Sequence, residues 1–484
     1  MSNDFFSDLL ASISERGRNL LRLGPASVDP KQNAIDLIDL CAELLSGRGE
    51  ASGTAIARGV LDRYQSLDDA GRVMFFETLA HKYGPDRDKL EKAIEAWRAK
   101  PTSDGAGALH IASEPQRQEL FRRLNRAPGG TSELVKMRED LLDLKNGNKE
   151  LNAVDSDVVH LFASWFNRGF LVLRRIDWST PANILEKVIK YEAVHEIHDW
   201  DDLRRRIDPV DRRCYAFFHP ALVDEPLIFV EVALTEAIPG AIAPLLAKDR
   251  EPVAIERART AVFYSISNCQ RGLGGISFGN FLIKQVVEEL RRELPKLDTF
   301  VTLSPVPGFM KWLKKADDLN LTNEDRALVD LLDDPLWAND TALREQLKPV
   351  MEGLAAHYFL KAKNARGGPV DSVARFHLGN GARLERIDWL GDMSAKGLRE
   401  SASLMVNYLY RLEDIEEPRS LCRSLRDRGI ERCEEAAQDR RRRIEAAGQY
   451  AVFTGGVRAP VVPADAGTHN LRVKNQGSVG MTAF

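Results

Sequence analysis

The sequence predicts an α + α/β fold, with an all-helical N-terminal domain over residues 1–168 and a mixed α/β domain over residues 169–450. In the first part, apolar residues recur at helical spacing and no segment alternates convincingly as a strand. In the second part, short segments rich in β-branched and aromatic residues alternate with amphipathic helices, which is the pattern of an α/β domain. Residues 451–484 are rich in glycine, proline, alanine and valine without a period, so we expect a loose C-terminal tail.

The helical part is predicted to be a series of amphipathic helices joined by short loops. Such a region most often serves as a scaffold or as an interface between subunits. Residues 101–107 contain a proline and two glycines, which favours a flexible loop within this part. Helices are expected near residues 33–45, 59–64, 73–83, 90–97 and 131–144.

The second part is predicted to contain a largely consecutive sheet. A helical insertion is expected over residues 311–365, and residues 394–410 are expected to form a last long helix. The other helices are expected at residues 181–191 and 277–294, and strands at 170–176, 213–218, 227–234, 261–267, 300–303, 373–378 and 383–389.

The composition is that of a globular protein rather than a disordered one. The chain has 484 residues, of which 44% are hydrophobic, and a formal net charge of −4, which gives no bias toward nucleic acid or membrane partners. No run of roughly 18 apolar residues occurs, so no membrane-spanning helix is expected. The five cysteines lack metal-site spacing and fit a reducing compartment, so we expect a cytoplasmic protein without a metal centre.

The most informative segment begins with the strand predicted at residues 261–267. It continues into a loop with glycine at positions 272, 274 and 275, and then into an amphipathic helix. Backbone N–H groups at such a loop and helix N-terminus form a physical anion site suited to phosphate. The loop is not a P-loop, because no Gly-Lys-Ser/Thr follows, and it lacks a Gly-x-Gly-x-x-Gly dinucleotide fingerprint. An ordinary tight turn is the alternative interpretation.

Two residues are candidates for chemistry beside this loop. Ser304 ends the strand that follows the loop's helix, on the edge of the sheet where the loop is expected. A Ser-Pro pair at that point is also a common start of a turn. His377 precedes a glycine-rich turn and is positioned to face a cleft, although a hydrogen-bonded core histidine fits the spacing equally well. His195 and His198 do not have the His-Glu-x-x-His spacing of a zinc site.

Several long motifs, in order, resemble the malonyl-CoA decarboxylase family. The resemblance is strong over about residues 160–410. The segments that carry it are His219–Leu227, Glu231–Thr235, Phe263–Ser267, Gly272–Leu273, Phe281–Lys284, Leu303–Phe309, Phe376–Leu378 and Asn380–Ala382.

The resemblance implies a catalytic domain with the fold of the GNAT-type N-acetyltransferases, behind a helical domain used for oligomerisation into a tetramer or dimer. In that fold the pyrophosphate of coenzyme A lies on the loop between a strand and the next helix. Arg271 and Gly274 fit the superfamily's loop pattern, Ile276 departs from it, and Ser277 stands where some relatives carry glutamate. The expected substrate contacts are Arg271, Gly272, Gly274, Gly275, Ile276, Ser277, Phe278, Gly279, Asn280 and Ile283.

The resemblance also places the family's catalytic serine and histidine at Ser304 and His377. The implied reaction turns malonyl-CoA into acetyl-CoA and CO2 through a thioester enolate. Because the thioester is the electron sink, no metal or other cofactor is expected. His377 is expected to supply a proton because histidine titrates near neutral pH, and Ser304 to bind the carboxylate or relay a proton. A coenzyme A-dependent N-acyltransferase, a non-catalytic acyl-CoA sensor and a purely structural scaffold are the alternatives.

Overall fold

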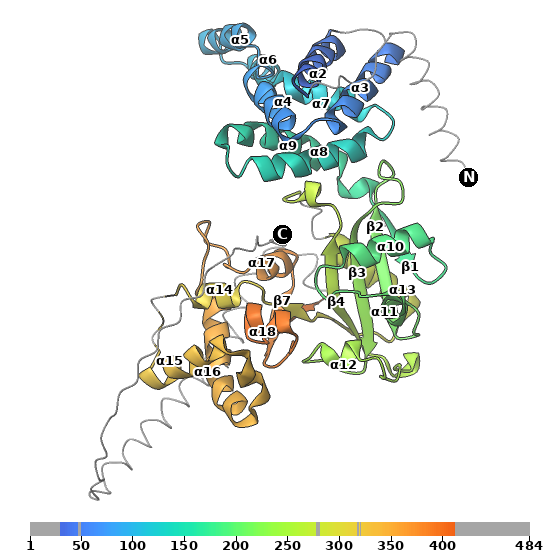
Figure 1. The fold of residues 1–484 in the computed structure, drawn as a ribbon, viewed down its shortest axis with the longest axis vertical. Coiled ribbons are helices and arrows are strands. Elements are labelled where there is room, and N and C mark those ends of the chain that lie inside the picture. The colour runs from blue at the N-terminus through green and yellow to red at the C-terminus, as the bar shows by residue number, and fades with distance from the viewer. Residues whose placement is uncertain (1–29, 47–49, 277–280, 317–318, 320, 412–484) are drawn as a thin grey trace, which may run out of the picture. The chain divides into compact units, whose positions relative to one another are not determined.

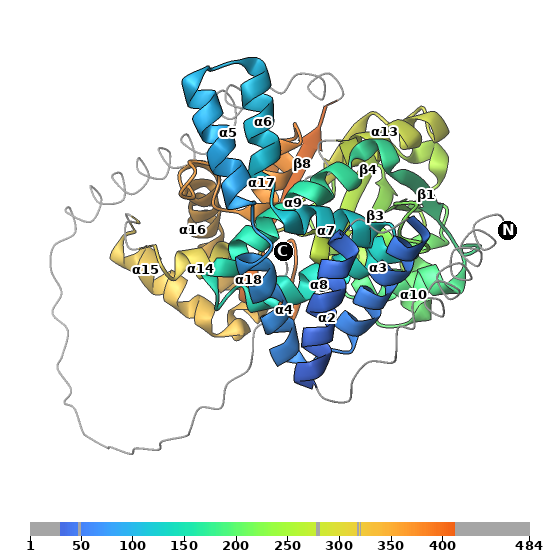
Figure 2. The ribbon, with the colours of Figure 1, turned by 90° about the horizontal axis from the view of Figure 1, so that it is seen from above.

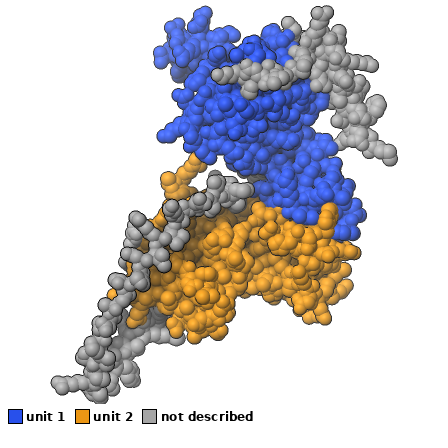
Figure 3. All heavy atoms as spheres, in the orientation of Figure 1, with its two compact units in different colours: residues 1–191, 215–229, 267–282 blue, residues 192–214, 230–266, 283–484 orange. Residues whose placement is uncertain are grey.

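The computed structural model describes residues 30–46, 50–276, 281–316, 319 and 321–411 (Figure 1). It confirms the predicted fold class, since a run of helices is followed by an eight-stranded mixed sheet with helices between its strands. The chain divides into two compact units (Figure 3). The first holds the described residues up to 191 with 215–229 and 267–282, and the second holds 192–214, 230–266 and the described residues from 283 onward.

The helical part forms because successive amphipathic segments bury one face each. Leu37, Leu40 and Leu44 recur at intervals of three and four residues and are buried, as are Phe75 and Phe76. Figures 1 and 2 show these helices in blue to teal. They are α2 (Pro30–Leu45), α3 (Glu50–Gln65), α4 (Asp69–His81), α5 (Arg87–Ala99), α6 (Ser103–Ser113), α7 (Gln116–Asn125), α8 (Gly130–Leu144) and α9 (Asn152–Trp165).

The prediction of a loop at residues 101–107 is wrong, because most of these residues belong to helix α6. Thr102 caps that helix by accepting a hydrogen bond from the Gly105 N–H at 3.0 Å. The cap and the alanines that follow outweigh the helix-weakening effect of the two glycines.

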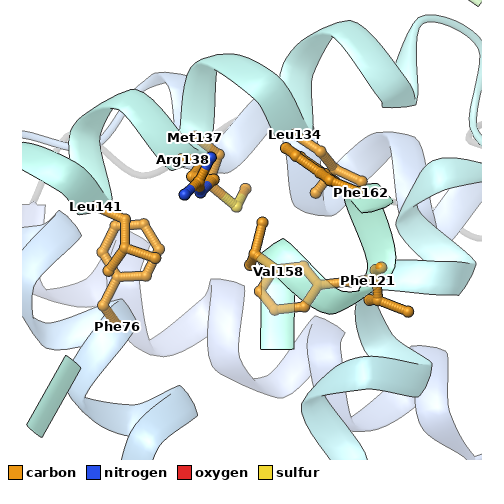
Figure 4. Close-up of a pocket in the computed structure, with 9 residues that line it drawn as sticks. Phe76, Phe121, Leu134, Met137, Arg138, Leu141, Val158 and Phe162 are labelled. Carbon is orange, nitrogen blue, oxygen red and sulfur yellow. The ribbon is translucent and has the colours of Figure 1, made fainter. Parts of the chain in front are cut away.

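A small cavity lies in the core of the helical part. It has a volume of about 10 Å³, roughly enough for one water molecule, and lies between α8 and α9 (Figure 4). Its wall is apolar except for Arg138, so it does not resemble a substrate site. The lining residues are Phe76, Phe121, Leu134, Met137, Arg138, Leu141, Val158, Leu161 and Phe162.

The sheet has the strand order β1-β2-β3-β4-β5-β8-β6, and β7 pairs with β8. Its first strands follow the order of the chain, as predicted. The strands are β1 (Val172–Ile176), β2 (Arg212–Phe218), β3 (Pro226–Thr235), β4 (Thr260–Asn268), β5 (Thr299–Thr302), β6 (Ser304–Pro305), β7 (Arg383–Asp388) and β8 (Met405–Tyr410).

Strands β4 and β5 are parallel neighbours, with Val262 opposite Val301 and Phe263 opposite Thr302. Helix α13 (Phe281–Glu293) connects them, as the strand-loop-helix-strand prediction requires. The remaining helices are α10 (Ala182–Tyr191), α11 (Trp200–Ile207), α12 (Ala243–Leu246), α14 (Phe309–Leu313), α15 (Asn323–Asp330), α16 (Thr341–Leu360), α17 (Ser372–Gly379) and α18 (Ala395–Ser401).

The strand predicted at residues 373–378 is wrong, because this segment forms helix α17. Asp371 caps the helix by accepting a hydrogen bond from the Ala374 N–H at 2.7 Å. Ala374, His377 and Leu378 are buried at helical spacing, and Gly381, with a φ of 85°, follows the helix end.

The long helix predicted over residues 394–410 is also wrong in its second half. Helix α18 ends at Ser401, and Ala402 and Ser403 then adopt left-handed backbone with φ of 48° and 67°. Non-glycine residues rarely take this conformation, so the sequence gives no local sign of the turn. The turn sends the chain into β8, which pairs antiparallel with β5, β6 and β7.

Candidate active site

Strand β8 sets the position of Ser304. Its pairing keeps one register across the break between β5 and β6, with Phe300 opposite Tyr410 and Ser304 opposite Val406. Side chains alternate between faces along a strand, and directly opposed residues share a face. Thr302, Ser304, Tyr408 and Tyr410 therefore lie on one face of the sheet.

His377 meets this face from the last turn of helix α17. Its Nε2 atom lies 3.3 Å from the Ser304 Oγ atom, and its Nδ1 atom lies 2.8 Å from the Tyr410 hydroxyl. The imidazole also stacks on the Tyr408 ring, with centroids 4.7 Å apart and an interplanar angle of 23°. The structure thus brings together the serine and the histidine that are 73 residues apart in the chain.

The hydrogen bonds around Ser304 form a continuous chain of hydroxyls and imidazole nitrogens. The Ser304 hydroxyl donates to Thr302 Oγ1 at 2.9 Å, and that oxygen also accepts the Tyr408 N–H at 3.2 Å. When Ser304 donates to Thr302, its oxygen is left to accept a hydrogen bond from the Nε2–H of His377. The Nδ1 atom then accepts a hydrogen bond from the Tyr410 hydroxyl.

Burial controls the protonation states of His377 and Tyr410. His377 is 3% exposed, and the loss of hydration lowers its pKa to about 3. The expectation that His377 titrates near neutral pH is therefore wrong, because burial keeps the imidazole neutral. Burial also raises the pKa of Tyr410 well above its ordinary value, so that hydroxyl stays protonated.

Helix α17, which carries His377, is fixed at its start by a buried carboxyl. Asp371 accepts the Ala374 N–H through one oxygen and the Tyr358 hydroxyl, at 3.1 Å, through the other. Burial raises the pKa of Asp371, and Tyr358 packs edge-on against Phe309 at the start of α14. The orientation of His377 therefore depends on a polar contact at the other end of its helix.

The glycine-rich loop forms a 3₁₀ turn over Arg271–Leu273 and is held by helix α8. The Gly272 N–H donates to Glu139 at 3.2 Å, and the Gly274 N–H donates to the Arg271 carbonyl at 2.9 Å. The Ile276 N–H is likewise bonded, to Leu273. Among the three glycines of the loop, this leaves only the Gly275 N–H without a hydrogen-bond partner among the described residues, and the φ of Gly275 is 79°.

The other predicted substrate residues differ in their surroundings. Arg271 is exposed and forms a two-pronged ion pair with Asp143, with distances of 2.7 and 2.8 Å. Ile276 and Ile283 are buried, so they contribute to packing of the loop and of α13. Ser277, Phe278, Gly279 and Asn280 lie outside the described residues.

Sequence reasoning missed Thr302, Tyr408 and Tyr410, which contact Ser304 or His377. Residues 394–410 were predicted to form a helix, so the two tyrosines were not expected to lie on a strand beside Ser304. Val406, Tyr408 and Tyr410 are of residue types enriched in strands, which is the signal that could have indicated a strand here.

None of the helices in the described part of the chain is both long and apolar enough to cross a membrane. Within those same residues, no three histidine, cysteine or acidic side chains gather in an arrangement that would hold a metal ion.

Comparison with known families supports the resemblance noted in the sequence. A family model for the malonyl-CoA decarboxylase N-terminal domain matches residues 83–166, and one for the malonyl-CoA decarboxylase C-terminal domain matches residues 169–425. The mitochondrial malonyl-CoA decarboxylase of Anser anser anser is 37% identical over 395 residues, which covers 73% of this chain and 77% of that protein. The mitochondrial enzyme of Rattus norvegicus is 38% identical over 392 residues, covering 72% of this chain and 78% of that protein.

Solved structures agree. The crystal structure of malonyl-CoA decarboxylase from Rhodopseudomonas palustris matches with a TM-score of 0.77 and 59% identity, covering 82% of this chain and 97% of that chain. The structure of malonyl-CoA decarboxylase from Agrobacterium vitis matches with a TM-score of 0.77 and 56% identity, covering 81% of this chain and 96% of that chain. This chain belongs to the malonyl-CoA decarboxylase family.

Proposed function

We propose that this chain decarboxylates malonyl-CoA to acetyl-CoA and CO2 through a thioester enolate, at the pair formed by Ser304 and His377. Family membership supplies the substrate and the overall reaction. The observation that carries the site is the 3.3 Å approach of Ser304 Oγ to His377 Nε2, on a buried face of the sheet.

The proposed reaction breaks the bond between C2 and the free carboxyl group of the malonyl unit. The electron pair moves to C2 and into the thioester carbonyl, CO2 leaves, and the resulting enolate takes a proton at C2. Hydrogen-bond donors aimed at the developing oxyanion lower this barrier, and one such donor is typically worth about 10²–10³ in rate. We assign this role to the Ser304 hydroxyl and the His377 Nε2–H, which would turn toward the oxyanion from their partners in the free protein, Thr302 and Ser304.

A neutral His377 is sufficient to protonate the enolate. The enolate carbon is a far stronger base than an alkoxide or an imidazolate, so an un-ionised O–H or N–H group can protonate it. The proton that C2 receives comes from Ser304 or His377, and the pair regains a proton from water before the next turnover. No covalent bond between Ser304 and the substrate is needed, because no acyl group is transferred.

The remaining parts of the proposal concern binding and assembly. The Gly275 N–H and the start of α13 would bind the phosphates of coenzyme A, and the thioester would make a separate cofactor unnecessary. Residues 169–450 would be a GNAT-like catalytic domain, and the helical domain would join subunits into a dimer or tetramer. We expect the enzyme to act in the cytoplasm.

The test is formation of acetyl-CoA from malonyl-CoA by the purified chain in the presence of EDTA. Ser304→Ala and His377→Asn should each lower kcat by about 10²-fold or more. Turnover of malonyl-CoA that survives both substitutions would keep the activity but reject the site. Binding of malonyl-CoA without release of CO2 would favour a sensor, and acylation of an amine would favour an acyltransferase.

A further inference from the structure

We infer that Arg138, a residue of the helical domain, is a positioning residue for binding of the coenzyme's phosphates. This inference rests on the proposed function, because it concerns the loop expected to bind coenzyme A. It assigns to helix α8 a part in substrate binding, in addition to the scaffold or interface role expected for the helical domain.

The guanidinium of Arg138 is buried, with 3% of its side chain exposed. Its NH1 group donates to the carbonyls of Gly272 and Gly274, at 2.6 and 2.8 Å. Its Nε group donates to Asp155 on helix α9 at 2.8 Å, and Lys145 pairs with the same carboxylate. One buried cation therefore ties the glycine loop to two helices.

Helix α8 holds the loop at several further points. A side chain at Gly272 would overlap the backbone carbonyl of Val135, so only glycine allows this close approach. Glu139 accepts the Gly272 N–H, and Asp143 pairs with Arg271. Positions 135, 138 and 139 lie on one face of the helix because they are three and four residues apart.

The bond to Gly274 sets the direction of the next N–H group. In a trans peptide the C=O and N–H bonds point in opposite directions, so a Gly274 carbonyl turned toward Arg138 turns the Gly275 N–H away from it. No hydrogen bond from this N–H to another described residue is present. A Cβ built on Gly275 would also meet no described atom within 4 Å.

The charge of Arg138 strengthens this arrangement. A cation next to a carbonyl oxygen polarises the peptide group. The N–H on the far side of that peptide then becomes a better hydrogen-bond donor to an anion. A phosphate group bound there accepts a hydrogen bond from a peptide that the helical domain has already oriented. Loss of Arg138 should then weaken binding of the phosphates and leave the chemistry at the thioester intact.

A second buried arginine provides the matched control. Arg117 donates to Asp157 at 2.5 Å and to the Leu79 carbonyl at 3.3 Å, so its contacts lie within the helical domain and do not reach the loop. Arg117→Gln should lower the thermal stability as Arg138→Gln does. Only Arg138→Gln should change substrate binding.

The experiment compares malonyl-CoA with malonyl-pantetheine, which has the same thioester but no phosphate. Arg138→Gln should raise KM for malonyl-CoA by about 10- to 100-fold, the range expected for hydrogen bonds from a charged donor, with kcat little changed. Its kcat/KM for malonyl-pantetheine should match that of the wild type. Arg117→Gln should resemble the wild type with both substrates.

Equal losses on both substrates, or an unchanged KM for malonyl-CoA, would overturn the positioning role. If Arg138→Gln does not fold, Arg138→Lys keeps the charge but not the planar guanidinium, whose NH1 and Nε groups hold the loop carbonyls and Asp155 in fixed directions, and its KM decides the question in the same way. If the wild-type chain does not decarboxylate malonyl-CoA, the proposed function fails by itself. Calorimetric titration with coenzyme A and with pantetheine then tests Arg138 separately, and weaker binding of coenzyme A alone is the expected result.

Discussion

The Tyr410 hydroxyl lies 2.8 Å from Nδ1 of His377, on the side of the imidazole opposite Ser304. Each ring nitrogen of His377 thus has one hydroxyl partner. The hydrogen bond at one nitrogen fixes which tautomer is present and so decides whether the other nitrogen donates or accepts. Tyr410, near the end of the last described strand, therefore controls the direction of the hydrogen bond between His377 and Ser304.

Tyr410→Phe should lower kcat about tenfold, the effect expected for loss of one hydrogen bond that orients a catalytic group, with little change in KM. The measurement is steady-state kinetics with malonyl-CoA. Tyr64→Phe is the control, because it removes another buried hydroxyl, bonded to Asp140 at 2.8 Å in the helical domain. If both variants behave alike, Tyr410 has only a structural role.

The pH profile of kcat/KM should show no inflection near 6.5, the ordinary pKa of a histidine. Burial lowers the pKa of His377 to about 3, so the imidazole is already neutral across the range from about pH 5 to pH 8. The phosphates of the substrate also titrate, and this changes kcat/KM. The pH dependence of the inhibition constant of coenzyme A is used to correct kcat/KM for that effect. A fall in the corrected kcat/KM as the pH rises through 6.5 would mean that the free enzyme must carry a charged His377.

The same pKa predicts acid sensitivity of the fold. His377 binds a proton in the unfolded chain below about pH 6.5 but in the native protein only near pH 3. The stability it contributes is therefore present above pH 6.5 and is lost as the pH falls, by about 1.4 kcal/mol per pH unit. The difference in melting temperature between pH 7 and pH 5 should be smaller in His377→Asn than in the wild type. His110→Asn, at an exposed position, should leave that difference unchanged.

Asp371→Ala should reduce both stability and turnover. It removes the cap of α17, which typically costs about 1 kcal/mol, and frees the helix that orients His377. Asp340→Ala removes a comparable cap, a bond from the Leu343 N–H at 3.0 Å, at the start of α16. We expect a larger fall in melting temperature for Asp371→Ala, because it also leaves the buried Tyr358 hydroxyl without its acceptor, and a fall in kcat for Asp371→Ala alone. An unchanged kcat in Asp371→Ala would show that His377 is oriented without the cap.

Gly272→Ala should raise KM for malonyl-CoA, because the added methyl group overlaps the Val135 carbonyl and forces the loop away from α8. Gly353→Ala is the matched control, since it lies within helix α16 and its added methyl group would have no described atom within 4 Å. Alanine should stabilise that helix by about 0.5–1 kcal/mol and leave the kinetics unchanged. A normal KM in Gly272→Ala would show that contact with α8 does not matter for binding.

The sequence alone determined the fold class and the strand-loop-helix-strand segment from β4 to β5. These elements are specified locally, by apolar periodicity and by glycine, and the structure has them close to the predicted bounds. Ser304 and His377 were identified by motif resemblance. Their residue types and spacing alone left a turn serine and a core histidine as alternatives.

The tertiary structure alone decided what surrounds those residues. Strand β8 forms because Ala402 and Ser403 turn through left-handed backbone and because its edges pair with β5, β6 and β7, and neither cause is visible in a local window. The low pKa of His377 follows from burial, which depends on the packing of α17 against the sheet. Contacts between residues far apart in the chain determine pairing, burial and charge, whereas local sequence determines only the elements that make those contacts.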